Sequence, residues 1–535
     1  VDEHLRYVGQ PIGVAVAGSR YLAEDTAEAV DLTIDQLGPV VDIDQAMAPD
    51  APLLYPESGT NVIATFEVGD TAKHDDTVFA AADRVLRTRL RIGRVHGLSL
   101  EGRGIVAIPG PRGKLTIHTS TQTPHGVRDS VCEVLGLRQN DVRVIAPDVG
   151  GGFGPKAGFY PEEIIVPFLA RSFGRPIKWI EDRHEHFVAT TTQRDQKWDV
   201  EVACNADGLI KGIRGEVTHE NGAYVPYGFL LPFTSLTPLP GPYAVPAVDV
   251  SLKVVFTNTT PNSPVRGAGR PYAIYAVERL IETISKNLNI DAAEVRRRNF
   301  VKEEQMPYAT GALLRDGSPV IYDSGNYHSC LEKALVLADH ASFKDRQTSA
   351  REEGRHIGMG ISSYVEDTGL GPYEGTTVRV QPNGKVLVRS GSASQGQGHH
   401  TFIAQIVADT LEVGMGDIVF ESGDTGKFPH GVGTIGSRIA ANVGPSAYEA
   451  ANAVKDKAIK LASETLEAAE QDLELSSGKV QVKGIEDLRE RLRDLAVDVY
   501  VSSMNPGTFF ESDDLSSAVR KSAILSAVSG DQGDL

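Results

Sequence analysis

The chain has 535 residues, of which 41% are hydrophobic and 23% charged, as in an ordinary globular protein. Its formal net charge of -18 argues against nucleic acid or an anionic membrane surface as the main partner. Three widely separated cysteines, Cys132, Cys204 and Cys330, show no zinc, iron–sulfur or disulfide spacing and indicate a reducing compartment. Because no apolar run approaches about 18 residues and no signal segment opens the chain, the sequence predicts a cytoplasmic protein without a membrane partner.

The amino-terminal part of the chain predicts alternating strands and helices. "RYVGQPIGVAVAG" is typical of a strand, a helix is expected at 21–37, and a Pro- and Asp-rich exit follows at 46–61. Because Val1 lies just before this strand, we expect the natural amino terminus to be missing. The elements expected between 62 and 200 are strands at 83–92 and 113–121 and a helix near 126–135.

The rest of the chain continues the mixed pattern. A hairpin is expected with Asp207-Gly208 at its turn, followed by a Pro-rich passage at 224–248 with little regular structure. The polar stretch at 341–356 predicts the main internal boundary. Beyond it we expect a hairpin turning at Pro382-Asn383-Gly384 and helices near 400–412 and 445–468. The fold class is therefore α+β, a mixture of sheets and helices.

One glycine loop raises the question of a nucleotide site. Gly152 to Ala157, "GFGPKA", satisfies the relaxed G-x-G-x-x-G/A pattern, and Glu181 and Asp182 follow the next apolar run, where a ribose-binding acid would belong. However, Pro155 and Gly158 disfavour an immediate helix, and the helix is expected to begin only at Pro161. A pyrophosphate at Gly152 would then miss the helix amides that bind it in a dinucleotide fold. An NAD-dependent dehydrogenase therefore remains only a less favoured hypothesis.

The loop has companions that share its pattern. Glycines mixed with Gln, Arg or Ser precede an amphipathic helix at 263–284, 392–411 and 433–454. Glycine lets backbone N–H groups approach a ligand closely, and helix starts favour anions. Several such loops exceed the needs of one mononucleotide and suit a large anionic cofactor between domains. Arg266 and Arg270 add planar donors for phosphate or oxo groups.

These motifs together resemble the large, molybdenum-binding subunit of the xanthine dehydrogenase, aldehyde oxidase and aerobic carbon monoxide dehydrogenase family. The resemblance runs from residue 5 to about 485. It rests on motifs that occur in the family's order: "TSTQTPHGVR" at 119–128, "PDVGGGFGPK" at 147–156, "VRGAGRP" at 265–271, "AAEVRRRNF" at 292–300, "QGQGHHT" at 395–401 and "GTIGSR" at 433–438. It implies the end of an α/β hammerhead domain at 1–55, a first molybdopterin-binding domain at 62–340, split near 200, and an incomplete second one at 341–535.

The resemblance also implies a cofactor and the residues that contact it. The cofactor is a molybdopterin, in its cytosine dinucleotide form, whose metal takes no ligand from the protein. Gln122, Phe153 and Arg266 match residues beside the molybdenum and are the expected catalytic residues. The expected cofactor contacts are Gly152, Phe153, Gly154, Arg266, Gly267, Gln397, Gly398, Thr434, Ser437 and Arg438.

Departures from the family pattern narrow the substrate. Gly267 stands where a carbon monoxide dehydrogenase in the strict sense carries a copper-binding cysteine, so a copper site is not expected. Ala157, Thr234 and Ala268 stand where purine hydroxylases carry groups that anchor or stack a purine. What remains is an aldehyde or N-heteroaromatic substrate, with Tyr364 and Glu366 as further candidates for the pocket.

The family resemblance finally implies a reaction with one part missing. Family members oxidise an electron-poor carbon with oxygen from water and need a general base, a glutamate in a "GxGE" motif near their carboxyl end. The sequence has no such motif, and its last residues do not resemble the family's. One hypothesis is a working subunit in a dimer of heterotrimers with a 2Fe-2S subunit and an FAD subunit, since the sequence encodes neither a cluster nor a flavin motif. The other is a cofactor-binding fragment without catalysis.

Overall fold

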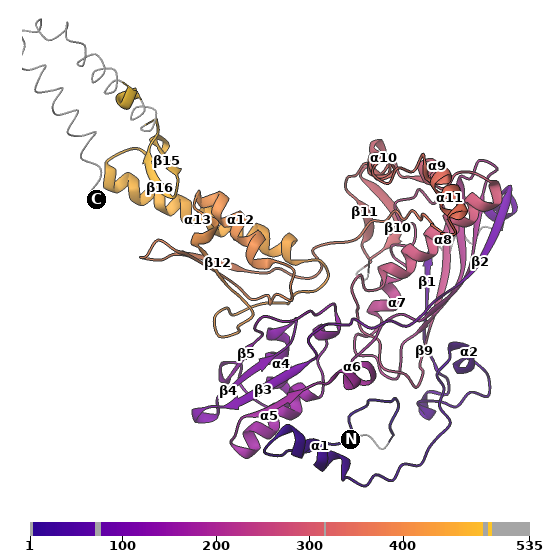
Figure 1. Ribbon diagram of the computed structural model, residues 1–535, viewed down its shortest axis with the longest axis horizontal. Coiled ribbons are helices and arrows are strands. Elements are labelled where there is room, and N and C mark those ends of the chain that lie inside the picture. The colour runs from indigo at the N-terminus through magenta and orange to yellow at the C-terminus, as the bar shows by residue number, and fades with distance from the viewer. Residues whose placement is uncertain (1–3, 70–75, 315–316, 485–490, 495–535) are drawn as a thin grey trace, which may run out of the picture. The chain divides into compact units, whose positions relative to one another are not determined.

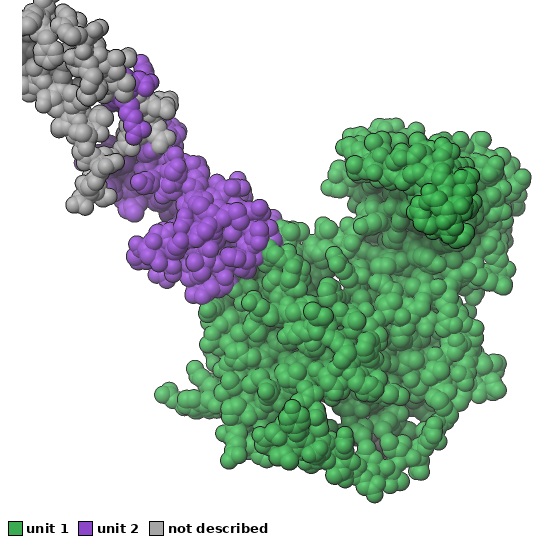
Figure 2. Space-filling model, in the orientation of Figure 1, with its two compact units in different colours: residues 1–375, 390–399, 422–443 green, residues 376–389, 400–421, 444–535 purple. Residues whose placement is uncertain are grey.

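The computed structural model describes residues 4–69, 76–314, 317–484 and 491–494 (Figure 1). They divide into two units (Figure 2). The first unit consists of residues 1–375, 390–399 and 422–443, and the second of residues 376–389, 400–421 and 444–535. Sheets and helices occur in both units, which confirms the predicted α+β class.

The larger sheet of the first unit has the strand order β1-β9-β8-β7-β2. Its strands are β1 (Val62–Gly69), β2 (Arg84–Ile92), β7 (Gln196–Cys204), β8 (Ile210–Glu220) and β9 (Val248–Val255). Helix α8 (Arg270–Leu288) buries Ala273, Val277 and Leu280 in the same core as Trp198 and Val200 of β7, at the i, i+4 spacing of a helix face. The predicted hairpin between β7 and β8 is confirmed, and Gly208 has φ +80 in its turn.

The second sheet of this unit has the order β5-β4-β3-β6. It consists of β3 (Gly104–Pro109), β4 (Leu115–Thr119), β5 (Val142–Ile145) and β6 (Ile177–Ile180), with helices α4 (Pro124–Leu135) and α5 (Glu162–Phe173) packed against it. Only β4 and β5 run parallel, whereas β3 is antiparallel to both of its neighbours. This mixed sheet is not the parallel sheet of a dinucleotide fold. As the proline predicted, α5 begins after Pro161.

The two sheets do not follow one another simply along the chain. Strands β1 and β2 come before the smaller sheet in sequence but pair with β9 and β7 in the larger one. The smaller elements around the sheets are α2 (Ile43–Ala46), α3 (Asp76–Ala80), α6 (Arg183–Ala189), α7 (Leu230–Thr234), α9 (Ala292–Asn299), β10 (Tyr308–Leu313), β11 (Pro319–Tyr322), α10 (Tyr327–Leu337) and α11 (Phe343–Glu352). Helix α11 occupies the stretch 341–356 and belongs to the first unit. In the described part of the chain, each helix is too short or too polar to cross a bilayer.

In the amino-terminal region the start of the predicted helix is confirmed, but the predicted strand and the predicted helix end were wrong. Residues 6–18 contain no strand, and α1 (Arg20–Glu28) ends well before residue 37. Residues 30–35, "VDLTID", alternate with period two, which is a strand pattern and does not support a helix. A strand also needs a neighbour for its backbone hydrogen bonds, and the described residues pair none with this region. Val14, Leu32 and Ile34 are accordingly exposed.

The second unit has a small sheet with the order β12-β13-β14. Its strands are β12 (Thr376–Val380), β13 (Val386–Ser390) and β14 (Ile418–Glu421), and the hairpin β15 (Leu473–Ser476) and β16 (Lys479–Val482) follows later. The predicted turn at Gly384 is confirmed, with φ +79. Both long helices are also confirmed as α12 (His399–Leu411) and α13 (Ile439–Leu466), although α13 begins earlier than predicted.

Candidate functional site

Gln122 lies at the point where the glycine loops of the first unit meet. It precedes α4 and is buried, with 4% of its surface exposed. Its Oε1 accepts a hydrogen bond from Gly154 N at 2.8 Å, and its Nε2 donates to the Thr434 carbonyl at 2.8 Å. A Cβ on Gly152 would lie 2.7 Å from Gln122 Oε1, so only glycine fits beside this side chain. Because Nε2 carries a second hydrogen, the amide retains a donor for a ligand.

The loop around Phe153 has a backbone conformation that residues other than glycine rarely adopt. Gly151, Phe153 and Gly154 have φ of +95, +58 and +112. A Cβ on Gly154 would stand 1.8 Å from the Pro264 carbonyl oxygen, which brings this loop directly against the segment that carries Arg266. Phe153 is 43% exposed, and its conformation is one that costs a non-glycine residue energy and is found most often at functional sites.

A buried cation and an acid hold the same loop from behind. Lys156 is buried, and its Nζ pairs with Glu101 Oε2 at 3.1 Å, while that oxygen also accepts the Gly150 N–H and the Ser120 hydroxyl. Burial lowers the pKa of Lys156. Partial burial acts to raise the pKa of Glu101, but the Gly150 N–H and the Lys156 ammonium outweigh it and keep that pKa below its usual value. The Glu101–Lys156 pair thus fixes both ends of the loop, at Gly150 and at Lys156.

Arg266 is fixed by its main chain while its side chain is exposed. Its N–H donates to the Phe153 carbonyl at 2.8 Å, and its carbonyl accepts from Arg194 Nη2 at 3.1 Å. Gly267 and Ala268 beside it have φ of +93 and +49. Within the described residues, no hydrogen bond or ion pair occupies the Arg266 guanidinium. An exposed arginine on a fixed loop, without a carboxylate partner, is suited to bind an anion. The guanidinium of Arg270 is not available in this way, since Nη2 pairs with Asp367 at 2.9 Å.

The loop before α13 joins this network. The Thr434 carbonyl accepts from Gln122, and the Thr434 hydroxyl donates to the Ala393 carbonyl. Ala393 also accepts from Gln395 Nε2 at 2.7 Å, and Gln395 Oε1 accepts from Gln397 Nε2 at 2.9 Å. Gln397 itself is exposed, and a Cβ on Gly398 would meet no atom within 4 Å, so this loop faces open space. The chain of contacts thus links the loops that carry Arg266, Phe153, Gln122, Thr434 and Gln397.

Arg438 lies differently from the other predicted contacts. Its side chain is fully buried and pairs with Glu374, which is also buried. Its Nε donates to the Leu370 carbonyl at 2.7 Å, and its other nitrogens donate to the Pro372 and Gly433 carbonyls. Arg438 therefore holds residues 370–374 against the Gly433 loop and directs its donors to protein groups. Ser437, with φ +52, is exposed, and its hydroxyl donates to Glu366 at 3.3 Å.

The predicted pocket residues lie in pairs around these loops. Thr234 stands against Gly269, because a Cβ there would meet Thr234 Oγ1 at 2.3 Å, and it is thereby next to Ala268. Glu366 contacts Ser437, and Tyr364 in the same segment is 63% exposed. Ala157 is half-buried, and its carbonyl accepts from the Thr123 hydroxyl. Contacts place Thr234 and Glu366 against glycine loops, and the described contacts join the five residues into no single cavity.

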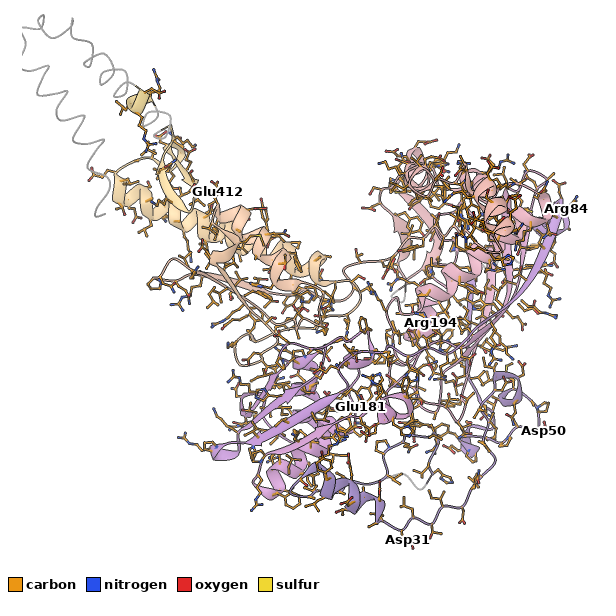
Figure 3. The ribbon with its side chains drawn as sticks, in the orientation of Figure 1. Asp31, Asp50, Arg84, Glu181, Arg194 and Glu412 are labelled. Carbon is orange, nitrogen blue, oxygen red and sulfur yellow. The ribbon has the colours of Figure 1, made fainter. Side chains whose placement is uncertain are left out.

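The acid that a dinucleotide fold would need is occupied elsewhere. Glu181, labelled in Figure 3, is buried and bonds to the main chain and guanidinium of Arg103, to Thr190 and to His186 of α6. Although burial acts to raise its pKa, its bonds to His186 and Arg103 lower the pKa of Glu181 to about 2. A carboxylate used in this way is not free to bind ribose hydroxyls.

Sequence reasoning missed several residues that support the site. Glu101, Gln193 and Glu374 each hold one of the glycine loops by hydrogen bonds to its main chain. No local motif marks them, since Glu374 is far from Gly433 in sequence and Gln193 is far from Ala268. Only the folded chain shows which main-chain groups they contact.

Comparison with known proteins identifies the class to which this arrangement belongs. Residues 54–300 and residues 333–522 each match a family model described as a molybdopterin cofactor-binding domain. The second match extends past residue 485, where the motif resemblance was expected to end. The chain belongs to the family of molybdenum hydroxylase large subunits.

Particular relatives agree with that placement. The chain is 34% identical to the carbon monoxide dehydrogenase large chain of Hydrogenophaga pseudoflava, over 93% of this chain and 65% of that protein. It is 35% identical to the 6-hydroxypseudooxynicotine dehydrogenase complex subunit gamma of Paenarthrobacter nicotinovorans, over 90% of this chain and 60% of that protein. Among solved structures, quinoline 2-oxidoreductase from Pseudomonas putida 86 has a TM-score of 0.80 and 33% identity, over 88% of this chain and 60% of that one. The chain thus spans less than two thirds of these relatives.

Proposed function

We propose that this chain is the cofactor-binding subunit of a cytoplasmic molybdenum hydroxylase that oxidises an aldehyde or an N-heteroaromatic compound with water as the oxygen source. The observation that carries the proposal is the convergence of Gln122, the Phe153 loop and Arg266 on one continuous hydrogen-bonded network, in which the exposed Arg266 guanidinium has no partner among the described residues. Relatives named for 6-hydroxypseudooxynicotine and quinoline favour a heteroaromatic substrate. Gly267 stands where carbon monoxide dehydrogenases in the strict sense carry a copper-binding cysteine, which argues against carbon monoxide as the substrate.

The residues present fit a molybdopterin. Among the described residues, no group of His, Cys, Asp and Glu side chains could hold a metal ion, so the donor set suits a metal held by its own cofactor. The available groups are hydrogen-bond donors: the second Gln122 Nε2 hydrogen, the Arg266 guanidinium and the open loop at Gly396 and Gly398. Such donors recognise phosphate and oxo groups. The cytosine dinucleotide form is our proposal for the nucleotide.

The chain's own residues have separate parts in the proposed reaction. When bound, the molybdenum cofactor supplies the two-electron oxidation and the oxygen transfer. Gln122 and Arg266 would hold the oxo-bearing end of the cofactor through their N–H donors, and Arg266 would place a positive charge beside it. Gly152 and Gly154 leave room for this approach. Ala157, Thr234, Ala268, Tyr364 and Glu366 line the substrate side.

The proposed complex contains two further kinds of subunit. The names "large chain" and "complex subunit gamma" of the relatives refer to multi-subunit proteins. We propose a 2Fe-2S subunit and an FAD subunit as the electron acceptors, assembled as a dimer of heterotrimers. A cofactor-binding fragment without catalysis is the alternative.

The proposal is tested by purifying the complex with its natural partners and measuring molybdenum and pterin. We expect both at one per chain, and a complex that contains neither would contradict the assignment. Arg266→Ala should then lower kcat by about 100-fold or more at full molybdenum content, because it removes a donor at the reacting centre. Arg279→Ala, which removes an exposed arginine of α8, is the matched control. Unchanged turnover in Arg266→Ala would refute the role of Arg266, and full cofactor content without turnover in the wild type would favour the fragment.

A further inference from the structure

A fully buried glutamine supports the loop that carries Arg266. Gln193 lies between α6 and β7 and has no exposed surface. Its Oε1 accepts from Val265 N, and its Nε2 donates to the Ala268 carbonyl at 2.6 Å. The Ala268 N–H in turn donates to the Val265 carbonyl at 2.7 Å. One side-chain amide therefore holds both ends of the turn in which Arg266 and Gly267 are the central residues.

The main chain of Gln193 connects this turn to the Phe153 loop. Gln193 and Val95 exchange backbone hydrogen bonds at 2.7 and 3.0 Å. Gly97, which follows closely after Val95, lies against Pro155, because a Cβ on Gly97 would stand 2.7 Å from the proline ring. A displacement of Gln193 would consequently shift both the Arg266 turn and the Phe153 loop, which the proposed function places at the cofactor.

The backbone next to Gln193 is unusual and explains how two neighbouring side chains reach the same loop. Successive side chains of an extended segment point to opposite faces, so Gln193 and Arg194 would normally diverge. Arg194 and Asp195 have φ of +72 and +94, which non-glycine residues rarely adopt and which the surrounding structure must enforce. Arg194, labelled in Figure 3, uses this bend to donate from Nη2 to the Arg266 carbonyl at 3.1 Å.

We propose that Gln193 is a positioning residue that sets where the Arg266 guanidinium lies, with Arg194 as its auxiliary. The inference rests on the proposed function, in which Arg266 binds the oxo-bearing end of the cofactor. With the main chain held at Val265, Arg266 and Ala268, only the side-chain torsions of Arg266 remain free. Loss of the Gln193 amide frees the turn itself, so that the guanidinium samples positions away from the reacting centre.

The test compares Gln193→Leu with Gln196→Leu in the assembled complex. Gln196 is also fully buried and bonds to His219, Ser235 and Trp198, but it does not touch the Arg266 turn. The measurements are hydrogen exchange in the peptide 263–270, molybdenum and pterin content, and kcat and KM. In Gln193→Leu we expect roughly tenfold faster exchange of the turn amides. We also expect kcat to fall by about 100-fold with little change in KM, while Gln196→Leu shows neither effect at a similar loss of thermal stability.

Each outcome bears on one of the two proposals. If Gln193→Leu exchanges and turns over like the wild type, or if Gln196→Leu loses kcat equally, the positioning role is refuted. If Gln193→Leu shows faster exchange of the turn without any fall in kcat per molybdenum, the turn is held but does not position the reacting group, and the inference is again refuted. A wild-type complex without molybdenum or pterin would overturn the proposed function instead, and it would be recognised before any variant is compared.

Discussion

Replacing Arg438 by methionine should lower the free energy of unfolding of the first unit, even when no cofactor is bound. The variant leaves the Glu374 carboxylate buried with only the Val432 and Gly433 N–H groups, at 3.0 and 3.3 Å from Oε1. It also removes the donor to the Leu370 and Pro372 carbonyls. Breaking a buried ion pair by removing one partner costs about 3–5 kcal/mol, and the unpaired carbonyls add to this. We therefore expect a loss of about 4 kcal/mol in the free energy of unfolding.

Tryptophan fluorescence during denaturation measures this loss in the cofactor-free chain. The sequence has only two tryptophans, Trp179 and Trp198, and both lie in the first unit, so the signal reports on that unit. The double variant Arg438→Met with Glu374→Gln should recover part of the loss, because it no longer buries an unpaired charge. If Arg438→Met leaves the unfolding midpoint of the cofactor-free chain unchanged and lowers only the cofactor content of the complex, Arg438 is a cofactor contact and the reasoning from its burial fails.

Two further predictions concern the loops and a buried acid. Gly154→Ala should cost about 2–4 kcal/mol in the free energy of unfolding, because Gly154 has φ +112 and the new Cβ would stand 1.8 Å from the Pro264 carbonyl oxygen. The control Gly174→Ala should cost only about 1 kcal/mol, because Gly174 has φ +62 and its Cβ would meet no atom within 4 Å. Equal losses for the two variants in fluorescence-monitored denaturation would contradict this prediction. Burial raises the pKa of Glu163 from 4.5 to about 7, so the folded chain binds more protons than the unfolded chain between these values and loses stability as pH rises through them. Glu163→Gln should remove this part of the pH dependence, so that its free energy of unfolding rises by up to about 3 kcal/mol relative to the wild type between pH 5 and 8. If the free energies of unfolding of the variant and the wild type change in parallel from pH 5 to 8, the prediction is wrong.

The sequence predicted the helices that follow the glycine loops well, because the signals for a helix start are local. Helices α8, α12 and α13 each begin after such a loop, as the pattern predicted. The start of α5 was also predicted from local chemistry, since Pro155 and Gly158 cannot continue a helix from Gly154. Predictions of this kind need no knowledge of which distant residues come together.

Two arginines show where such local reasoning ends. Arg266 and Arg438 both lie beside glycines, in "VRGAGRP" and "GTIGSR", and the family resemblance implied a cofactor contact for each. The structure separates them by their partners: the Arg266 guanidinium is exposed, whereas Arg438 is buried against Glu374. A buried acid that lies far away in sequence leaves no periodic signal beside the arginine it neutralises. The strand predicted in the amino-terminal region was wrong for a related reason, since it also depended on a distant partner. A segment with a strand pattern forms a strand only where a neighbouring strand pairs with it.

The way the loops are joined has a consequence for specificity. Gly154 N, the Thr434 carbonyl and the Phe153 carbonyl are main-chain groups, which every residue type except proline would supply at 154 and every residue type would supply at the two carbonyls. Substitutions at Ala157 or Ala268 can therefore change the shape of the proposed substrate side without removing any of these hydrogen bonds, provided that the new residue at 268 tolerates φ +49. In contrast, Gln122 and Gln193 contribute their side chains to the network, and neither can change without losing a buried bond. Among proteins with this fold, we therefore expect differences in substrate to arise from residues such as Ala157 and Ala268, whose side chains make none of these hydrogen bonds. We expect the geometry of the cofactor site to depend on Gln122 and Gln193, whose side chains do.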